Sequence, residues 1–254
     1  MLNLRVVTLN LWNNDFFRFE RAHLVTKEIA SLQPHLVALQ EVSIVHDMAA
    51  WIVNRLNEES YGGEYSASPW NKIGPQGASE GLAILSCLPV IGMREAIDLK
   101  GGGRIAQRII VEFQGQKIAL CNLHLHHPRE ADELRVSQSH LASEWMLSLN
   151  DCAQIMAGDF NSTPESKTMV SLYERWASAY ASHSGKEPEY TSPTPLAECG
   201  EEPFSHRSAI DYILFTPSSL RVTHAELCFT KPGGHGGDLY PSDHYGLVAD
   251  FEIK

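Results

Sequence analysis

An acid and a histidine lie side by side near the C-terminus of this sequence, at Asp243 and His244. They fall within residues 240–247 (YPSDHYGL), between a glycine-rich loop and an apolar run. We expect the chemistry of the protein to lie at this pair. A dipeptide alone is a weak signal, and its significance depends on polar residues elsewhere in the chain. Those residues are Asn10, Glu41, His124, Asp159, Asn161 and Asp211.

Three apolar runs end in polar residues, a pattern by which an α/β scaffold assembles a site from distant parts of a sequence. Each run reads as a buried strand that delivers its last side chains to one edge of a sheet. The runs are residues 4–11, 36–42 and 155–161, and the polar residues at their ends are Asn10, Glu41, and Asp159 with Asn161.

Glu41 is the first candidate for a metal ligand. With Asp243 as a distant partner and no cysteine and histidine ligand cluster, it suits a hard ion that prefers oxygen ligands. We therefore expect Mg²⁺, with Mn²⁺ as the alternative. His124 is a candidate contact for a phosphate or a leaving group. A transition-metal site at His124, His126 and His127 is the less favoured alternative, because only the first two share a face of a strand.

Helices and strands that would position these residues follow from the apolar periodicity. The pattern predicts helices over 18–33, 44–59 and 129–149, and strands over 81–86 and 247–253. It also predicts a hairpin over 105–113 and 117–124, and a pair of strands over 209–216 and 220–229. Residues 61–77, 183–208 and 231–241 are expected to be loops that set specificity.

Several hairpins among these strands fit a plain parallel sheet poorly. The predicted fold class is α/β, with two packed mixed β-sheets flanked by helices. We expect one domain over residues 1–254, because this length buries a substantial core.

The composition limits the partners that the chain can have. It is 43% hydrophobic and 20% charged, with a formal net charge of −11, so a broad basic face for nucleic acid is not expected. The five cysteines show no C-x-x-C spacing and are expected to be reduced thiols. No signal peptide or membrane span is evident, and we expect a cytoplasmic monomer without integral membrane contact.

Seven short motifs follow one another from end to end of the chain: T-L-N (8–10), L-Q-E-V (39–42), G-L-A-I-L-S (81–86), N-L-H-L (122–125), G-D-F-N (158–161), I-D-Y-I-L (210–214) and S-D-H (242–244). In this order they resemble the endonuclease/exonuclease/phosphatase superfamily. The resemblance implies a DNase I-like fold, a four-layer α/β sandwich, and a Mg²⁺-dependent phosphoester hydrolase. Residues 240–247 are also similar to the ending of its tyrosyl-DNA phosphodiesterase branch.

The resemblance also implies a role for each polar residue. Three would serve the metal: Glu41 as a direct ligand, Asn10 as its support and Asp243 as part of the metal region. Five would be catalytic: His124 on a phosphate oxygen, Asp159 on the attacking water, Asn161 on the developing oxyanion, and Asp211 orienting His244. His244 could act as a protonated donor or as a general base, and both assignments stay open. Some members carry an aspartate where this chain has Trp12, so the resemblance implies a single-carboxylate metal arrangement.

Substrate-binding residues are harder to assign. Arg104, after three glycines, is a candidate phosphate contact, Arg108 is a weaker one, and a solvated surface position is the alternative. Trp12 and Trp70 are candidates to stack a base or cover a lipid, although packing at the core or rim is favoured for each. We expect hydrolysis of a phosphodiester in a nucleic acid or at a nucleic-acid end. The alternatives are a lipid head group or small-molecule phosphoester and, least favoured, a non-catalytic binding module.

Overall fold

Strand pairing sorts the chain into two mixed sheets. The computed structural model describes residues 3–58, 64–71, 79–128, 130–199, 207–234 and 236–254. In these residues the first sheet has the strand order β11-β12-β1-β2-β4-β3 and the second β5-β6-β7-β8-β10-β9. The first contains β1 (Leu4–Asn10), β2 (Leu36–Ser43), β3 (Ser66–Asn71), β4 (Glu80–Ser86), β11 (Leu220–Cys228) and β12 (Gly246–Ile253). The second contains β5 (Glu95–Asp98), β6 (Ile105–Phe113), β7 (Gln116–His124), β8 (Ala153–Asp159), β9 (Ala177–Ser178) and β10 (Asp211–Phe215).

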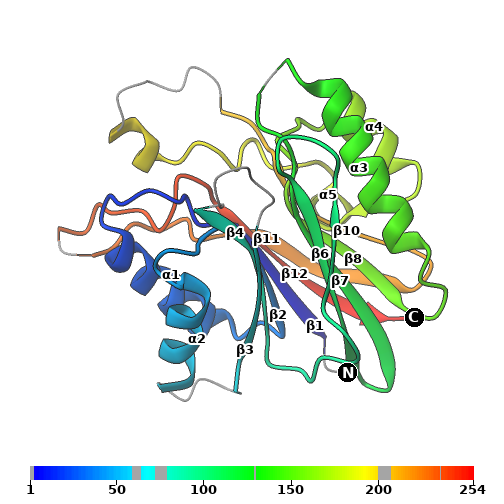
Figure 1. Ribbon diagram of the computed structural model, residues 1–254, viewed down its shortest axis with the longest axis horizontal. Helices are drawn as coiled ribbons and strands as arrows, with labels where there is room; N and C mark the ends of the chain where they lie inside the picture. Colours follow the sequence, from blue (N-terminus) through cyan, green and yellow to red (C-terminus); the bar gives the residue numbers. More distant parts are fainter. Residues whose placement is uncertain (1–2, 59–63, 72–78, 129, 200–206, 235) are drawn as a thin grey trace.

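Helices cover the outer face of each sheet. α1 (Arg18–Leu32) and α2 (Met48–Glu58) pack on the first sheet, and α3 (Asp132–Leu147) and α4 (Lys167–Tyr173) pack on the second (Figure 1). A short α5 (Ala179–Ser184) contacts β10 and β11, and a 3-10 helix spans Pro195–Cys199. The predicted four-layer arrangement of two mixed sheets flanked by helices is therefore confirmed.

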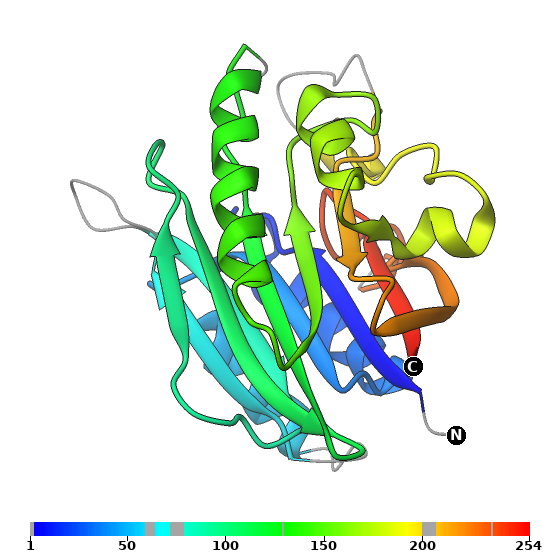
Figure 2. The same cartoon turned by 90° about the vertical axis from the view of Figure 1, so that its right-hand side faces the viewer.

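The continuous apolar run of β1 follows from burial on both faces. Leu4 and Val6 belong to the core between the two sheets, whereas Val7 and Leu9 belong to the core under α1 and α2. Successive side chains of a strand point to opposite faces, so a strand inside a four-layer sandwich has no polar face. β1 starts beside the N-terminus and carries its last residue, Asn10, to the other end of the sandwich (Figures 1 and 2).

One pairing predicted from the sequence is wrong. Residues 209–216 and 220–229 were expected to pair with each other, but β10 pairs with β8 and β9, whereas β11 pairs with β12 in the other sheet. The turn between them crosses from one sheet to the other, and Phe215 and Leu220 both join the core between the sheets. The two strands thus lie in different sheets, and β10 faces β12 and β1 across the core.

Two of the three predicted loops contain residues of a helix or strand. Residues 61–77 include the edge strand β3, and residues 183–208 include the end of α5, the 3-10 helix and an isolated bridge between Ser192 and Ser208. Residues 61–63, 72–77, 200–206 and 235 lie outside the described part of these segments. None of the helices in the described residues has the length and apolar character that a membrane crossing requires.

Candidate active site

Polar residues of the first sheet gather where β1 ends. β1 and β2 run parallel, so Asn10 pairs with Gln40 and lies next to Glu41. β12 runs antiparallel to β1 and begins at Gly246, two residues after His244. The segment that carries the Asp-His pair therefore reaches the same end of the sandwich.

The second sheet brings three more residues to this end. β7 and β8 are parallel, and their last residues, His124 and Asp159, are paired. β10 is antiparallel to β8, so that its first residue, Asp211, pairs with Asp159. The two sheets thus deliver every sequence-predicted catalytic and metal residue to one end of the fold.

Asn10 connects the two sheets within the site. Its Nδ2 donates to Glu41 Oε1 at 3.2 Å and to Asp159 Oδ2 at 3.0 Å. The side chain of Asn10 is 1% exposed, and His124 Nε2 lies 3.4 Å from the same Asp159 oxygen. One amide group therefore holds two carboxylates near each other, which is an arrangement that an isolated pair of anions would not adopt.

A local irregularity in β2 aims the Glu41 side chain. The pairing register of β2 with β4 shifts between Leu39 and Val42, and Glu41 has a positive φ of 52°. Bulges of this kind redirect a side chain at the end of a strand. The second oxygen of the carboxylate, Oε2, accepts a hydrogen bond from the backbone N–H of Asn13 at 2.9 Å.

The G-D-F-N motif builds the turn that presents Asp159 and Asn161. The backbone N–H of Asn161 donates to Asp159 Oδ1 at 2.9 Å, and its side-chain Nδ2 donates to the carbonyl of Leu125 at 3.1 Å. Gly158 is required next to this turn, because a Cβ there would lie 2.0 Å from the carbonyl oxygen of Leu123.

His244 and Asp211 form a buried hydrogen-bonded pair. The distance from Nδ1 to Asp211 Oδ2 is 2.8 Å, and the exposures of the two residues are 7% and 1%. Thr191 Oγ1 also donates to Asp211 Oδ2, at 2.6 Å, and Nε2 of His244 lies 4.0 Å from Asp243 Oδ1. The bond at Nδ1 fixes the orientation of the ring and leaves Nε2 to face the site.

Burial and charge shift the pKa values of these groups. Burial raises the pKa of Asp159 to about 7, and the nearby Asp211 adds to this, although His244 and hydrogen bonds from Asn161 and Asn10 oppose it. Burial likewise raises the pKa of Asp243 to about 6, with a further contribution from Glu41.

The pKa of His244 moves in the direction that favours its charged form. Burial opposes the imidazolium, but the carboxylates of Asp211 and Asp243 and the hydrogen bond to Asp211 outweigh it, so the pKa of His244 lies well above its ordinary value. His244 is therefore a cation near pH 7, beside an Asp159 that is poised between its two forms.

Arg104 is buried beside this cluster and is not a solvated surface residue. Its exposure is 6%, and its Nη2 lies 3.2 Å from His127 Nδ1. Nε and Nη1 are buried and have no hydrogen-bond partner among the residues that the structure describes. Burial lowers the pKa of Arg104, and the charges of Asp159, Glu80 and Glu41 oppose this shift. A buried guanidinium with two unused donors near carboxylates is suited to receive an anion.

Arg108 does not share this position. It pairs with Glu95 at 2.7 Å and donates to the carbonyl of Trp145 at 2.8 Å, with its guanidinium over the Trp145 ring. These contacts are with β5 and α3, so the expectation that Arg108 contacts substrate phosphate is not supported.

Glu80 is a site residue that the sequence patterns did not identify. Glu41, Glu80 and His124 each offer a ligand atom, and these atoms lie within 4.8 Å of one another. Glu80 begins β4, whose antiparallel pairing with β2 brings it opposite Ser43. The usable signal was its position directly before G-L-A-I-L-S, at the start of a strand whose neighbour carries Glu41 near its end.

Two carboxylates and an imidazole at this spacing fit a divalent cation that prefers oxygen ligands. Asn10 supports the site by fixing one oxygen of Glu41. A second group with ligand atoms within 4.8 Å comprises Asp159, Asp211 and His244, but there the histidine Nδ1 already bonds Asp211. Neither group contains His126 or His127.

Comparison with known proteins adds an independent observation. Residues 7–244 match the sequence profile of the Endonuclease/Exonuclease/phosphatase family. The chain is 25% identical to Nocturnin of Drosophila melanogaster over 311 aligned positions, which cover 99% of this chain and 46% of that protein. It is 28% identical to Nocturnin of Rattus norvegicus, over 92% of this chain and 59% of that protein. The chain thus spans about half the length of these curated relatives.

The fold is also similar to that of solved structures. The structure of D. rerio TDP2 complexed with single strand DNA product superposes with a TM-score of 0.80 at 20% sequence identity, covering 98% of this chain and 99% of that chain. The expected likeness to the tyrosyl-DNA phosphodiesterase branch is confirmed at the level of the fold.

Proposed function

Because the chain belongs to the endonuclease/exonuclease/phosphatase family, whose members are phosphoester hydrolases, we propose that it cleaves a phosphodiester bond in a nucleic acid or at a nucleic-acid end. The observation that carries this proposal is the hydrogen-bonded bridge of Asn10 between Glu41 and Asp159, facing the buried pair of His244 and Asp211. It combines a metal-ligand carboxylate, a base and a cation within one site.

Asp159 is the residue suited to orient and deprotonate the attacking water. A raised pKa of about 7 makes this carboxylate a stronger base than an ordinary aspartate while leaving it substantially ionised at neutral pH. As the water oxygen bonds to phosphorus, its proton passes to Asp159, the bond to the leaving oxygen breaks, and solvent protonates that oxygen.

Positive charge and hydrogen-bond donors would stabilise the phosphate oxygens during this step. His244 donates from Nε2 as an imidazolium, and Asn161 and His124 are neighbours of Asp159 that can contact other oxygens. Arg104 offers its two unused nitrogens to a non-bridging oxygen. Bound at Glu41, with Glu80, Asn10 and Asp243 around it, a divalent ion such as Mg²⁺ or Mn²⁺ would neutralise phosphate charge.

His244 suits the role of donor better than that of general base. A base must be neutral to accept a proton, whereas Asp211 and Asp243 hold this histidine in its charged form. Asp159, with its raised pKa, takes the role of base.

Nucleic acid is proposed as the substrate class because of the relatives. One similar structure holds a single-strand DNA product, and the matched sequences include a CCR4-Not complex 3'-5'-exoribonuclease subunit of Debaryomyces hansenii, 24% identical over 55% of this chain and 21% of that protein. Lipid and small-molecule phosphoesters remain the alternative substrates to be measured beside nucleic acid.

Turnover of bis-p-nitrophenyl phosphate with Mg²⁺ and with EDTA tests the reaction class. We expect metal-dependent hydrolysis that falls by about a hundredfold or more in Asp159→Asn and in His244→Ala. Asp151→Asn is the matched control, since it removes an exposed carboxylate that pairs with Lys117. Near-wild-type turnover in either site variant would contradict the assignment.

A panel of single-stranded oligonucleotides, a choline phospholipid and an inositol phosphate then separates the substrate classes. We expect kcat/KM to be higher for the oligonucleotides than for the phospholipid or the inositol phosphate. A higher kcat/KM for the lipid or the inositol phosphate would replace nucleic acid by that class.

A further inference from the structure

Trp12 is held in an unusual backbone conformation at the edge of the site. Its φ is 54°, in the left-handed region, where a bulky residue is costly. Its N–H donates to Asn10 Oδ1 at 3.0 Å, and its carbonyl accepts from the N–H of Asn14 at 2.6 Å. The same Asn10 that bridges Glu41 and Asp159 thus fixes Trp12 as well.

Arg21 supports the indole from behind. Its guanidinium carbon lies 4.8 Å from the centre of the Trp12 ring, and the residue is 2% exposed. Burial lowers the pKa of Arg21 to about 10, so it remains charged near pH 7. A cation over the face of a tryptophan is attractive and fixes the ring.

The hydrogen bonds of Arg21 make the segment around Trp12 rigid. Its five bonds, 2.7 to 3.4 Å long, all go to backbone carbonyl oxygens, four of them between β1 and α1 and one just before β12. The acceptors belong to Leu11, Trp12, Asn14, Phe16 and Pro241. The indole is therefore positioned before any substrate arrives.

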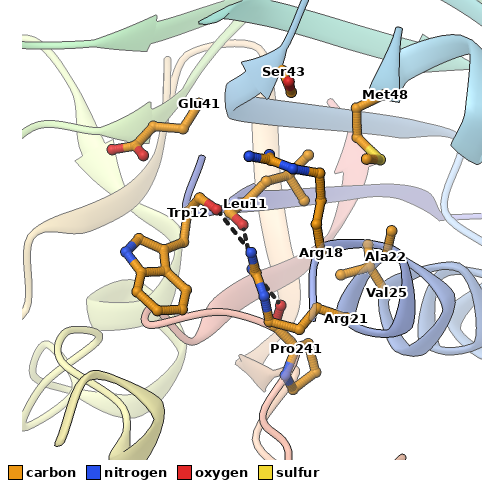
Figure 3. Close-up of a pocket in the computed structure, with 10 residues that line it drawn as sticks. All are labelled: Leu11, Trp12, Arg18, Arg21, Ala22, Val25, Glu41, Ser43, Met48 and Pro241. Atoms are coloured by element: carbon orange, nitrogen blue, oxygen red, sulfur yellow. Dashed lines mark hydrogen bonds between the residues drawn. The ribbon is translucent and has the colours of Figure 1, made fainter. Parts of the chain in front are cut away.

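The position of Trp12 is beside the candidate metal ligand. Trp12, Glu41 and Arg21 line one cavity of about 20 Å³ (Figure 3). Figure 3 shows the indole and the Glu41 carboxylate on the left, Met48 on the right and the Arg18 guanidinium between them. The cavity is too small for a nucleobase, but the indole is only half-buried. A planar group can therefore reach the exposed part of the indole but not the cavity.

We propose that Trp12 is a stacking platform for a nucleobase next to the scissile phosphate. This proposal rests on the proposed nucleic-acid substrate, and it adds that the chain contacts a base of that substrate as well as its phosphate. Stacking on an aromatic side chain contributes substantially to binding of single strands and tolerates any base. It suits a chain with a net charge of −11, which gains little from neutralising phosphates.

The test compares a short oligothymidylate with an abasic oligomer of the same length and backbone charge. Trp12→Ala is expected to lower kcat/KM on oligothymidylate by roughly 5- to 100-fold, the range found for loss of one stacked base. The abasic oligomer should be cleaved equally by wild type and variant. Trp12→Phe should recover most of the loss, because it keeps an aromatic face.

Trp51→Ala is the matched control. Trp51 is also a half-buried tryptophan beneath an arginine, Arg55 at 5.5 Å, but it lies on α2 and outside the cavity. We expect it to leave the ratio of the two kcat/KM values unchanged. Fluorescence anisotropy in EDTA gives the Kd values of the same oligomers for the same variants, so that the comparison does not depend on turnover.

Each outcome bears on a different proposal. If Trp12→Ala lowers kcat/KM equally on oligothymidylate and on the abasic oligomer, or changes neither value, the stacking platform is refuted while the nucleic-acid substrate stands. If the wild type hydrolyses bis-p-nitrophenyl phosphate but neither cleaves nor binds the two oligomers, the nucleic-acid proposal and the platform both fail.

Discussion

The bond between His244 and Asp211 sets which protonation form of the imidazole faces the substrate. Asp211 is the largest contribution that raises the pKa of His244, and burial opposes it. Without the aspartate, burial would have less opposition, and the pKa of His244 would fall. The role of this histidine as a donor therefore depends on a residue from another strand.

Asp211→Asn is expected to move the activity profile to lower pH. A donor must be charged, so its contribution is present below its pKa and is lost as pH rises through that value. In wild type this loss falls well above pH 6.5, and in the variant we expect it near or below that value. Turnover of bis-p-nitrophenyl phosphate at pH 8 should drop by about a hundredfold and should recover partly at pH 6.

Asp250→Asn serves as the control for this profile, because Asp250 is also a buried, paired aspartate, 2.7 Å from Arg5. Its profile should match that of wild type. If Asp211→Asn were instead more active near pH 7 than wild type, His244 would be acting as a general base.

Residue types in a fixed order were sufficient to identify most of the candidate site from the sequence. Asn10, Glu41 and Asp159 were expected at strand ends, and the structure brings Glu41 and Asp159 within hydrogen-bond distance of Asn10. Glu80 and Thr191 were missed. Glu80 lies at the start of a strand rather than at its end, and Thr191 reaches Asp211 from a segment that has no periodicity.

At the scale of elements, the parallel pair β7 and β8 holds His124 against Asp159, and their close approach depends on Gly158. A Cβ at Gly158 would lie 2.0 Å from a backbone oxygen of β7, which no side-chain rotation can relieve. The conflict can be resolved only by moving one strand.

Gly158→Ala is expected to destabilise the fold by about 3 kcal/mol, and the resulting fall in Tm should be roughly 6 to 12 °C. Gly115→Ala is the control, since Gly115 also has a positive φ, 78°, but has no atom within 4 Å of the added carbon. It should cost only about 1 kcal/mol. Equal Tm values for the two variants would show that the close contact in β8 does not limit stability.

Sequence patterns located most elements but not the sheet to which each belongs. Alternation along β10 and β11 is the same whether the two strands pair side by side or stack across a core, so the predicted hairpin was wrong. The edge strand β3 was missed because its six residues, SASPWN, contain few of the apolar residues that mark buried strands. Both failures concern long-range contacts, which local periodicity does not encode.

For the molecule as a whole, the acidic cluster at one end of the sandwich makes stability depend on pH and on cations. The folded-state pKa values of Asp159 and Asp243 are raised to about 7 and about 6. A carboxyl with a raised pKa contributes stability below its unfolded value, and this contribution is lost as pH rises through the folded value. The metal-free protein should therefore lose stability between about pH 4 and pH 7.

Mg²⁺ should stabilise the protein more at pH 8 than at pH 5.5. At the higher pH the carboxylates are ionised and an added cation offsets their repulsion, whereas at the lower pH protons already do so. Thermal unfolding with and without Mg²⁺ measures the difference in Tm. Glu41→Gln should abolish the Mg²⁺ effect, and an unchanged effect in that variant would remove Glu41 from the metal site.

The net charge of −11 limits how many phosphates the molecule can neutralise when it binds nucleic acid. Arg104 is the buried cation with unused donors in the described part of the site, so few phosphates can be neutralised there. For a single strand, the logarithm of the binding constant falls with the logarithm of the salt concentration, with a slope of about −0.7 for each phosphate contact. One or two contacts therefore predict a slope of about −0.7 to −1.4. The Kd of oligothymidylate in EDTA, measured from low to high KCl, tests this value.

Arg104→Gln should bring the slope closer to zero by about 0.7, whereas Trp12→Ala should weaken binding without changing the slope. A wild-type slope steeper than about −3 would mean that a basic surface, and not stacking beside the catalytic end, holds the strand.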